Sequence, residues 1–210
     1  MTVYHGTHIQ HIRTLTPVAN PQNAITKSTI CFTPNSNIAL FYIWNRAYKW
    51  VAFSEEENGR VVFTEYYKNM LYDFYRETSG SIYECESDNP NIRPTHMKGV
   101  YISEVPVVVQ KEIIIPDVYE EICKQSALGN IIVREYAQLT TEEKVLITKR
   151  TIMAIHREKL LFPTNNKAKT EKIDFVRYHF PKEWEYASKM KNEEITKMEN
   201  QWRAYLKTRQ

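Results

Sequence analysis

The sequence predicts an α+β fold, in which a mixed, mostly antiparallel sheet core is followed by a helical C-terminal extension. Two β-prone runs, 48–54 and 60–67, flank Asn58-Gly59, and this dipeptide is a strong signal for a hairpin turn. The last third of the chain instead has helical periodicity and a capping box. With 210 residues, 42% of them hydrophobic, the chain is long enough to bury a core.

The remaining elements of the front part follow from turn residues and short apolar runs. A short helix over 69–77 ends at Ser79-Gly80, and a strand over 81–86 follows. The stretch 99–115 reads as one or two strands around Pro106, which cannot donate to a ladder. A helix then begins at the cap Asp117 and ends before Gly129.

The back part is expected to be helical. Thr140 and Glu143 form a capping box that opens a helix of about 140–161, and a polar stretch over 164–174 separates it from a last helix near 183–207. We therefore predict two domains, 1–138 and 139–210, with the second packed on the first. The last helix carries one apolar stripe for that packing, although the stripe also suits a partner-binding surface: Ile195, Met198, Trp202, Tyr205 and Leu206.

Charge and composition limit the function classes. The net charge of +3 divides into −3 over residues 1–138 and +6 over 139–210. The basic extension suits a nucleic acid or another polyanion, and its alternating signs suit a solvated helix face equally well. No apolar run reaches the roughly 18 residues that span a bilayer, so we expect no membrane partner and a cytoplasmic location. Three widely spaced cysteines, Cys31, Cys85 and Cys123, fit neither a disulfide framework nor a zinc site.

Three histidines open the chain at three-residue spacing, His5, His8 and His11. On a helix this spacing spreads the side chains too widely to converge on one metal ion. Moreover, Val3-Tyr4-His5 reads as the tip of a strand that ends at Gly6, so His5 would not share a helix with the others. We expect His8 and His11 to be ordinary residues of a short helix after that strand.

The residues around His5 carry a more specific pattern. The segment "YHGT", followed by "LTP" and then by "STICFTPNSNIALFYIW", resembles the front of the ADP-ribosyltransferase fold, in its diphtheria-toxin and poly-ADP-ribose-polymerase branch. The resemblance implies that NAD is the substrate. It implies that His5 hydrogen-bonds the adenosine ribose, that the Gly6 backbone meets the nicotinamide carboxamide, and that Thr7 adds a hydroxyl to the pocket.

The second motif of that family resembles this sequence with one substitution. Phe32 and Thr33 take the positions of phenylalanine and alanine, and Tyr42 takes that of the second, stacking tyrosine. Cys31 stands where the family has the tyrosine that packs on nicotinamide. Tyr42 can stack on one face of the ring, and Tyr83 or Phe32 is the candidate for the other face.

The third motif is a glutamate that grips the nicotinamide ribose and stabilises the cationic transition state. The position expected for it falls near Lys98 or Gly99, where the sequence has no carboxylate. The nearest carboxylates are Glu104 and, on the preceding strand, Glu84 and Glu86, whose spacing puts the last two on one face. Together with His5, Glu104 and Glu84 are the candidate catalytic residues.

Three functions are compatible with these observations. The first is an enzyme that transfers ADP-ribose from NAD to a protein or nucleic-acid acceptor, or that hydrolyses NAD. The second is a catalytically weakened member of the same fold that binds NAD without turning it over, which the missing tyrosine and glutamate favour. The third is a protein whose basic helical part binds nucleic acid or another partner. The sequence leaves the oligomeric state open.

Overall fold

A computed structural model describes residues 1–18, 28–50, 53–55 and 58–207 of the chain. The chain divides into two compact units, the first comprising Met1–Asn45 and Val51–Glu135 and the second comprising Arg46–Trp50 and Tyr136–Gln210. The first unit contains sheets and short helices, and the second is built from helices, so the protein is of the α+β class that the sequence predicts.

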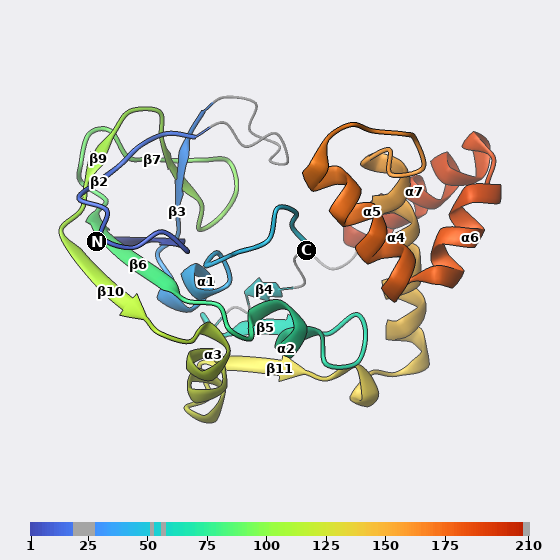
Figure 1. The fold of residues 1–210 in the computed structure, drawn as a ribbon, viewed down its shortest axis with the longest axis horizontal. Helices are drawn as coiled ribbons and strands as arrows, with labels where there is room; N and C mark the ends of the chain where they lie inside the picture. The colour runs from blue at the N-terminus through green and yellow to red at the C-terminus, as the bar shows by residue number, and fades with distance from the viewer. Residues whose placement is uncertain (19–27, 51–52, 56–57, 208–210) are drawn as a thin grey trace. The chain divides into compact units, whose positions relative to one another are not determined.

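The central sheet of the first unit has the strand order β1-β6-β10, with β6 between the two others (Figure 1). The strands are β1 (Thr2–Thr7), β6 (Gly80–Glu86) and β10 (Lys111–Ile115), and both pairs are antiparallel. In a pleated sheet, directly opposed residues project from the same face and their chain neighbours from the other. The register therefore decides which side chains share a face.

A second sheet lies beside β1 and has the order β3-β8-β7. Its strands are β3 (Ile30–Phe32), β8 (Tyr101–Ser103) and β7 (Arg93–Pro94). The two sheets meet at one antiparallel bridge, in which the amide N–H groups of Tyr4 and Thr33 each donate to the other's carbonyl, at 2.7 and 3.0 Å. Strand β2 (Thr14–Leu15) pairs with β9 (Val107–Val108). The stretch 99–115 thus holds three strands rather than the one or two expected, each in a different sheet.

A hairpin is confirmed between β4 (Phe53–Glu55) and β5 (Val61–Thr64). Of the first predicted strand, 48–54, residues 48–50 belong to no strand and residues 51–52 lie outside the described residues. Gly59 has the positive φ of 78° that its turn requires, and the Asn58 side chain accepts a hydrogen bond from the Arg60 amide. Strand β11 (Ile131–Arg134), which the sequence analysis did not anticipate, pairs in parallel with β5. The sheets of the first unit are therefore mostly, but not wholly, antiparallel.

Three short helices complete the first unit: α1 (Ser36–Leu40), α2 (Met70–Tyr75) and α3 (Val118–Ala127). The predicted cap Asp117 is confirmed, since its side chain accepts from the Glu120 amide, and Gly129 beyond α3 has a positive φ. Asn35 caps α1 in the same way, by accepting from the Asn37 amide. Each cap satisfies an amide that the first helical turn leaves without a partner.

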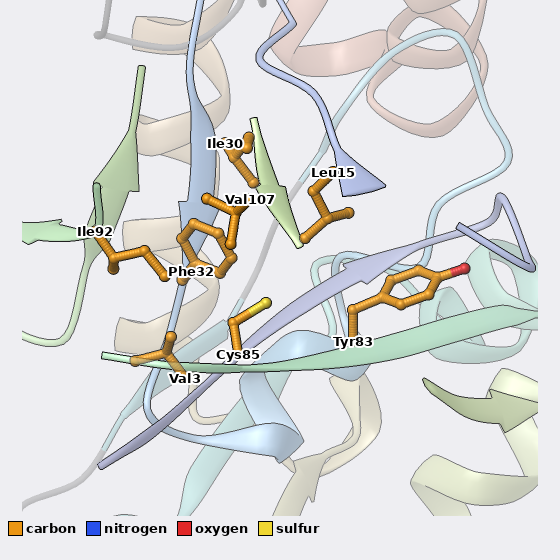
Figure 2. Close-up of a cluster of buried hydrophobic side chains, with 8 residues drawn as sticks. All are labelled: Val3, Leu15, Ile30, Phe32, Tyr83, Cys85, Ile92 and Val107. Carbon is orange, nitrogen blue, oxygen red and sulfur yellow. The ribbon is translucent and has the colours of Figure 1, made fainter. Parts of the chain in front are cut away.

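Two groups of apolar side chains form the core of this unit. One lies between the central sheet and the strands beside it, and Figure 2 shows its members: Val3, Leu15, Ile30, Phe32, Tyr83, Cys85, Ile92 and Val107. The other is aromatic, with Phe41 stacked on Phe63 at 5.4 Å and Tyr75 set edge-on to both. Burying a large apolar side chain of this kind contributes about 2 kcal/mol, so both groups stabilise the first unit.

The second unit is helical, as expected, with different boundaries. Helix α4 (Thr141–Arg157) has the predicted capping box of Thr140 and Glu143 and ends earlier than expected. Helix α5 (Lys167–His179) occupies most of the stretch that we expected to be a polar linker. The sequence did not predict this helix, because its buried Phe175 and Val176 lie within a largely polar segment. The expected last helix is two helices, α6 (Pro181–Lys189) and α7 (Asn192–Lys207). A 3-10 turn over Tyr136–Gln138 precedes α4.

The second unit has its own aromatic core. Trp50, which we expected to belong to the first hairpin strand, packs on Phe175 and Phe180 at 5.7 and 5.5 Å. The Lys172 ammonium lies 5.5 Å from the Trp50 ring centroid and 2.5 Å from a Glu158 carboxylate oxygen. Helix α7 packs on α4, and the Arg150 guanidinium lies over the Trp202 ring. Among the described residues, no helix is both long and apolar enough to cross a bilayer.

Candidate functional site

His5 is half-buried near the end of β1, directly after Tyr4, whose bridge to Thr33 joins the central sheet to the β3 sheet. Its Nδ1 lies 2.8 Å from the Cys31 carbonyl oxygen, and its ring meets Phe32 edge-on with centroids 6.0 Å apart. Because a carbonyl only accepts, Nδ1 carries a proton, and in the neutral ring Nε2 holds the lone pair. His5 therefore has a fixed ring orientation with one nitrogen assigned.

The register of the central sheet places three functional side chains in one row. His5 on β1 opposes Tyr83 on β6, and Tyr83 opposes Glu112 on β10. Opposed residues share a face, so the three side chains project from the same side of the sheet, spread over about 10 Å. Thr7 and its opposed residue Ser81 lie on that side too. We call this side, with His5, Thr7, Ser81, Tyr83 and Glu112, the His5 face.

Glu112 is the best-anchored carboxylate of this face. Its Oε1 accepts hydrogen bonds from the Ser81 hydroxyl at 2.6 Å and the His11 amide at 2.8 Å, and the Tyr83 hydroxyl lies 3.0 Å away. These bonds, the one from Ser81 first, lower the pKa of Glu112 below its ordinary value. At neutral pH the His5 face therefore holds a fixed negative charge. The sequence analysis did not single out Glu112.

Gly6 is buried where α1 crosses β1. A Cβ at this position would lie 1.9 Å from the Ala39 carbonyl oxygen, so only glycine permits the close approach. The peptide groups of β1 alternate in direction: Met1 is hydrogen-bonded to Ser87, just beyond β6, whereas Tyr4 is hydrogen-bonded to Thr33 on the other edge. Odd-numbered residues of β1 therefore direct their N–H and C=O toward β6, and even-numbered residues direct theirs away from it. This alternation directs the N–H and C=O of Gly6 away from β6, and no described residue hydrogen-bonds to them.

Thr7 ends β1 on the His5 face, where the sequence analysis expected a pocket hydroxyl. Its Oγ1 accepts a hydrogen bond from the Ile9 amide at 3.3 Å, which starts the loop of residues 8–13. No helix forms in this loop, so the short helix expected around His8 and His11 was wrong. The His11 backbone instead has a positive φ of 61° and sits against Glu112.

The expected aromatic clamp is only partly assembled. Phe32 and Tyr83, the two candidates for one face of the ring, are 3% and 0% exposed and belong to the core cluster, with the Tyr83 hydroxyl pointing out of it (Figure 2). The structure thus gives both rings a packing role. Tyr42, two positions beyond α1, is 41% exposed and remains accessible.

Cys31 links Tyr42 to His5. Strand alternation turns the Cys31 side chain away from its neighbour Phe32, toward the side from which Tyr42 approaches. Although Tyr42 is partly exposed as a residue, burial around its hydroxyl and the nearby Cys31 thiol raise its pKa. His5 contacts the carbonyl of the same cysteine. The Cys31 side chain therefore approaches Tyr42 on the side of β3 away from Phe32, whose ring packs on His5.

The three carboxylates proposed from the sequence lie elsewhere. Glu84 and Glu86 alternate with Tyr83 along β6, so they project from the sheet side opposite to His5. Glu84 pairs with Lys111 at 3.2 Å, and Glu86 lies 3.7 Å from the Met1 amino group. Glu104 follows β8 and forms an ion pair with Arg93. None of the three shares the His5 face, because the expectation used alternation along one strand without knowing which residue opposes His5.

Two further features of the structure bear on the site. A shallow hollow lies at β7 and β8, and none of the expected site residues lines it: Arg93, Pro94, Thr95, His96, Met97 and Ile102. In the part of the chain that the structure describes, no group of three or more histidine, cysteine, aspartate or glutamate side chains is placed to hold a metal ion.

Comparison with known proteins gives no relative for this chain: no family model, no curated protein and no solved structure matches it.

One signal in the sequence could have identified Glu112. It is a charged residue directly before three consecutive isoleucines, in a run that reads as a strand. A carboxylate within such a strand is either solvated or held by specific donors. The donors Ser81 and Tyr83 come from β6, so only strand pairing reveals which of the two applies.

Proposed function

We propose that this chain binds NAD on the His5 face and acts as an ADP-ribosyltransferase-like protein, which transfers ADP-ribose to an acceptor or hydrolyses NAD. The observation that carries the proposal is the row of His5, Tyr83 and Glu112 across three neighbouring strands. We also propose that the α+β core is of the ADP-ribosyltransferase type, since a histidine strand, an aromatic strand and a glutamate strand are the parts that the resemblance implies.

The end of β1 supplies groups suited to the two ends of NAD. With Nδ1 of His5 donating to the Cys31 carbonyl, Nε2 is the ring nitrogen that carries the lone pair, and a lone pair is what a ribose hydroxyl donates to. The N–H and C=O of Gly6 form a donor and acceptor pair directed away from β6, which is the complement of a carboxamide. Tyr42 offers an accessible ring for stacking on nicotinamide.

Glu112 supplies the charge that the reaction needs. When nicotinamide leaves, positive charge develops on the ribose, and a fixed carboxylate stabilises that state more than the ground state. Glu112 suits this role because three hydrogen-bond donors hold Oε1 in place and keep the group ionised at neutral pH. We therefore transfer the third catalytic role from Glu84 and Glu104 to Glu112.

A second candidate is a nucleotide-binding protein of the same fold with little or no turnover. Two observations favour it: Cys31 replaces the tyrosine that would pack on nicotinamide, and both Phe32 and Tyr83 are buried in the core. Nicotinamide would then be stacked on one face only, by Tyr42. If the chain has a macromolecular acceptor or partner, the charge of +6 over residues 139–210 favours a polyanion such as nucleic acid.

Calorimetric titration with NAD, paired with an assay for nicotinamide release, tests the proposal. Loss of one electrostatic contact to the transition state costs about 3 kcal/mol, so Glu112→Gln should lower the release rate roughly a hundredfold or more and leave NAD affinity nearly unchanged. Glu84→Gln is the matched control, because Glu84 lies on the neighbouring strand and on the opposite face. Binding without release in the wild type supports the second candidate. No binding at millimolar NAD contradicts both.

A further inference from the structure

The loop of residues 8–13 is fixed to the central sheet at successive positions. The Ile9 carbonyl lies 2.9 Å from the Tyr83 hydroxyl, and the same hydroxyl accepts a hydrogen bond from the Ile12 amide. The Gln10 side chain donates to the Gly80 carbonyl, and the His11 amide donates to Glu112. The partners of Gln10, His11 and Ile12 all come from β6 or β10, so the loop has a defined position over the His5 face.

His11 occupies the centre of this loop in a conformation that side chains rarely adopt. Its φ of 61° is in the left-handed region, which costs a residue other than glycine about 1 kcal/mol. The hydrogen bond to Glu112 is made by the backbone, whereas the imidazole is 75% exposed. The side chain is thus not needed to anchor the loop.

The two oxygens of Glu112 are used differently. Oε1 receives all three hydrogen-bond donors, from Ser81, His11 and Tyr83. Among the described residues, Nδ1 of His11 lies 3.6 Å from Oε2, an ion-pair distance that is longer than a hydrogen bond. In the neutral tautomer that keeps the proton on Nδ1, beside the carboxylate, Nε2 of His11 holds the lone pair. A carboxylate beside an imidazole is a pairing suited to a general base, because it stabilises the imidazolium that forms when the base takes up a proton.

We infer that His11 is a further catalytic residue, the base that receives the proton of the acceptor during ADP-ribosyl transfer. The inference rests on the proposed function. It also specifies the acceptor as water or a hydroxyl group, because these nucleophiles must lose a proton and gain from a base.

The step balances without another reagent. The bond between ribose C1′ and the nicotinamide nitrogen breaks, and nicotinamide leaves as a neutral molecule with the electron pair. The acceptor oxygen forms the new bond to C1′, and its proton passes to Nε2 of His11, which later releases it to solvent. Glu112 stabilises the cationic ribose and, beside His11, the imidazolium that forms.

The experiment compares His11→Asn with His8→Asn in the full-length protein. Asparagine tolerates a positive φ and keeps the amide that binds Glu112, so His11→Asn removes the imidazole without removing the anchor. His8 is exposed in the same loop and serves as the control. The measurements are the NAD dissociation constant, the rate of NAD hydrolysis between pH 5 and 9, and the melting temperature.

We expect His11→Asn to hydrolyse NAD about a hundredfold or more slowly, with NAD affinity within twofold of wild type and an unchanged melting temperature. Added imidazole should restore part of the lost rate, because it replaces the missing base. A wild-type rate in His11→Asn overturns the inference, as does an equal loss in affinity or melting temperature. A wild type that binds NAD without hydrolysing it overturns the inference but not NAD binding, and absence of binding overturns the proposed function itself.

Discussion

Replacing Gly6 by alanine separates the structural role of this glycine from its proposed contact with NAD. The new methyl group would lie 1.9 Å from the Ala39 carbonyl oxygen and 2.9 Å from its carbonyl carbon. Ordinary contact at a Cβ begins near 3.4 Å, so α1 must move by about 1.5 Å from β1. The obstacle is backbone and cannot rotate away.

The expected cost is at the upper end of the range for overpacking. Inserting a methyl group into a packed core costs about 1–3 kcal/mol, and here the shift of α1 also loosens Ala39 and Leu40, which are 0% and 2% exposed. We therefore expect Gly6→Ala to lower the free energy of unfolding by about 3 kcal/mol. In a unit of this size, such a loss lowers the melting temperature by roughly 10 °C.

Chemical and thermal unfolding followed by circular dichroism measure this cost. Gly59→Ala is the control, since that glycine has a φ of 78° with no atom near its Cβ position, and should lose only about 1 kcal/mol of backbone strain. If Gly6→Ala unfolds within 0.5 kcal/mol of the wild type, in the range of ordinary surface changes, the close approach of α1 to β1 is refuted. Any loss of NAD binding in a folded Gly6→Ala protein would then report on the site itself.

Three further predictions test other contacts. Glu158→Ala should destabilise the protein by about 3 kcal/mol, because it leaves the buried Lys172 ammonium unpaired. Lys172→Met removes the charge and should stay within about 1 kcal/mol of the wild type. Urea titration that finds Lys172→Met the less stable of the two variants contradicts the buried ion pair. The pKa of Glu112 is lowered in the folded protein. Its contribution to stability is therefore present above the pKa of an unfolded glutamate, about 4.3, and is lost as the pH falls through the folded pKa. The difference in unfolding free energy between the wild type and Glu112→Gln should accordingly shrink from pH 7 to pH 3. Burial raises the pKa of the Cys85 thiol to about 11. At pH 8 a thiol reagent should therefore modify the half-buried Cys31 and Cys123 first and reach Cys85 only in denaturant. Mass spectrometry that finds Cys85 modified first would contradict its burial.

The sequence alone determined those features that depend on neighbouring residues. The Asn58-Gly59 turn, the Asp117 cap and the capping box of Thr140 and Glu143 were all predictable, because each is a contact within about three residues. The α+β class follows from the same local signals. The unexpected α5 shows their limit, since a polar helix with few buried side chains has a weak periodicity.

The tertiary structure decided which residues share the His5 face. Tyr83 lies 78 positions after His5, and Glu112 another 29, so their pairing depends on strand register and not on any local pattern. A shift of one residue in that register would exchange Glu112 for its neighbours and move Tyr83 to the opposite side of the sheet. The sequence could identify His5 and list the carboxylates. The choice among the carboxylates depended on how side chains alternate across three paired strands. The buried apolar residues fix the register of these strands only when the whole sheet has formed.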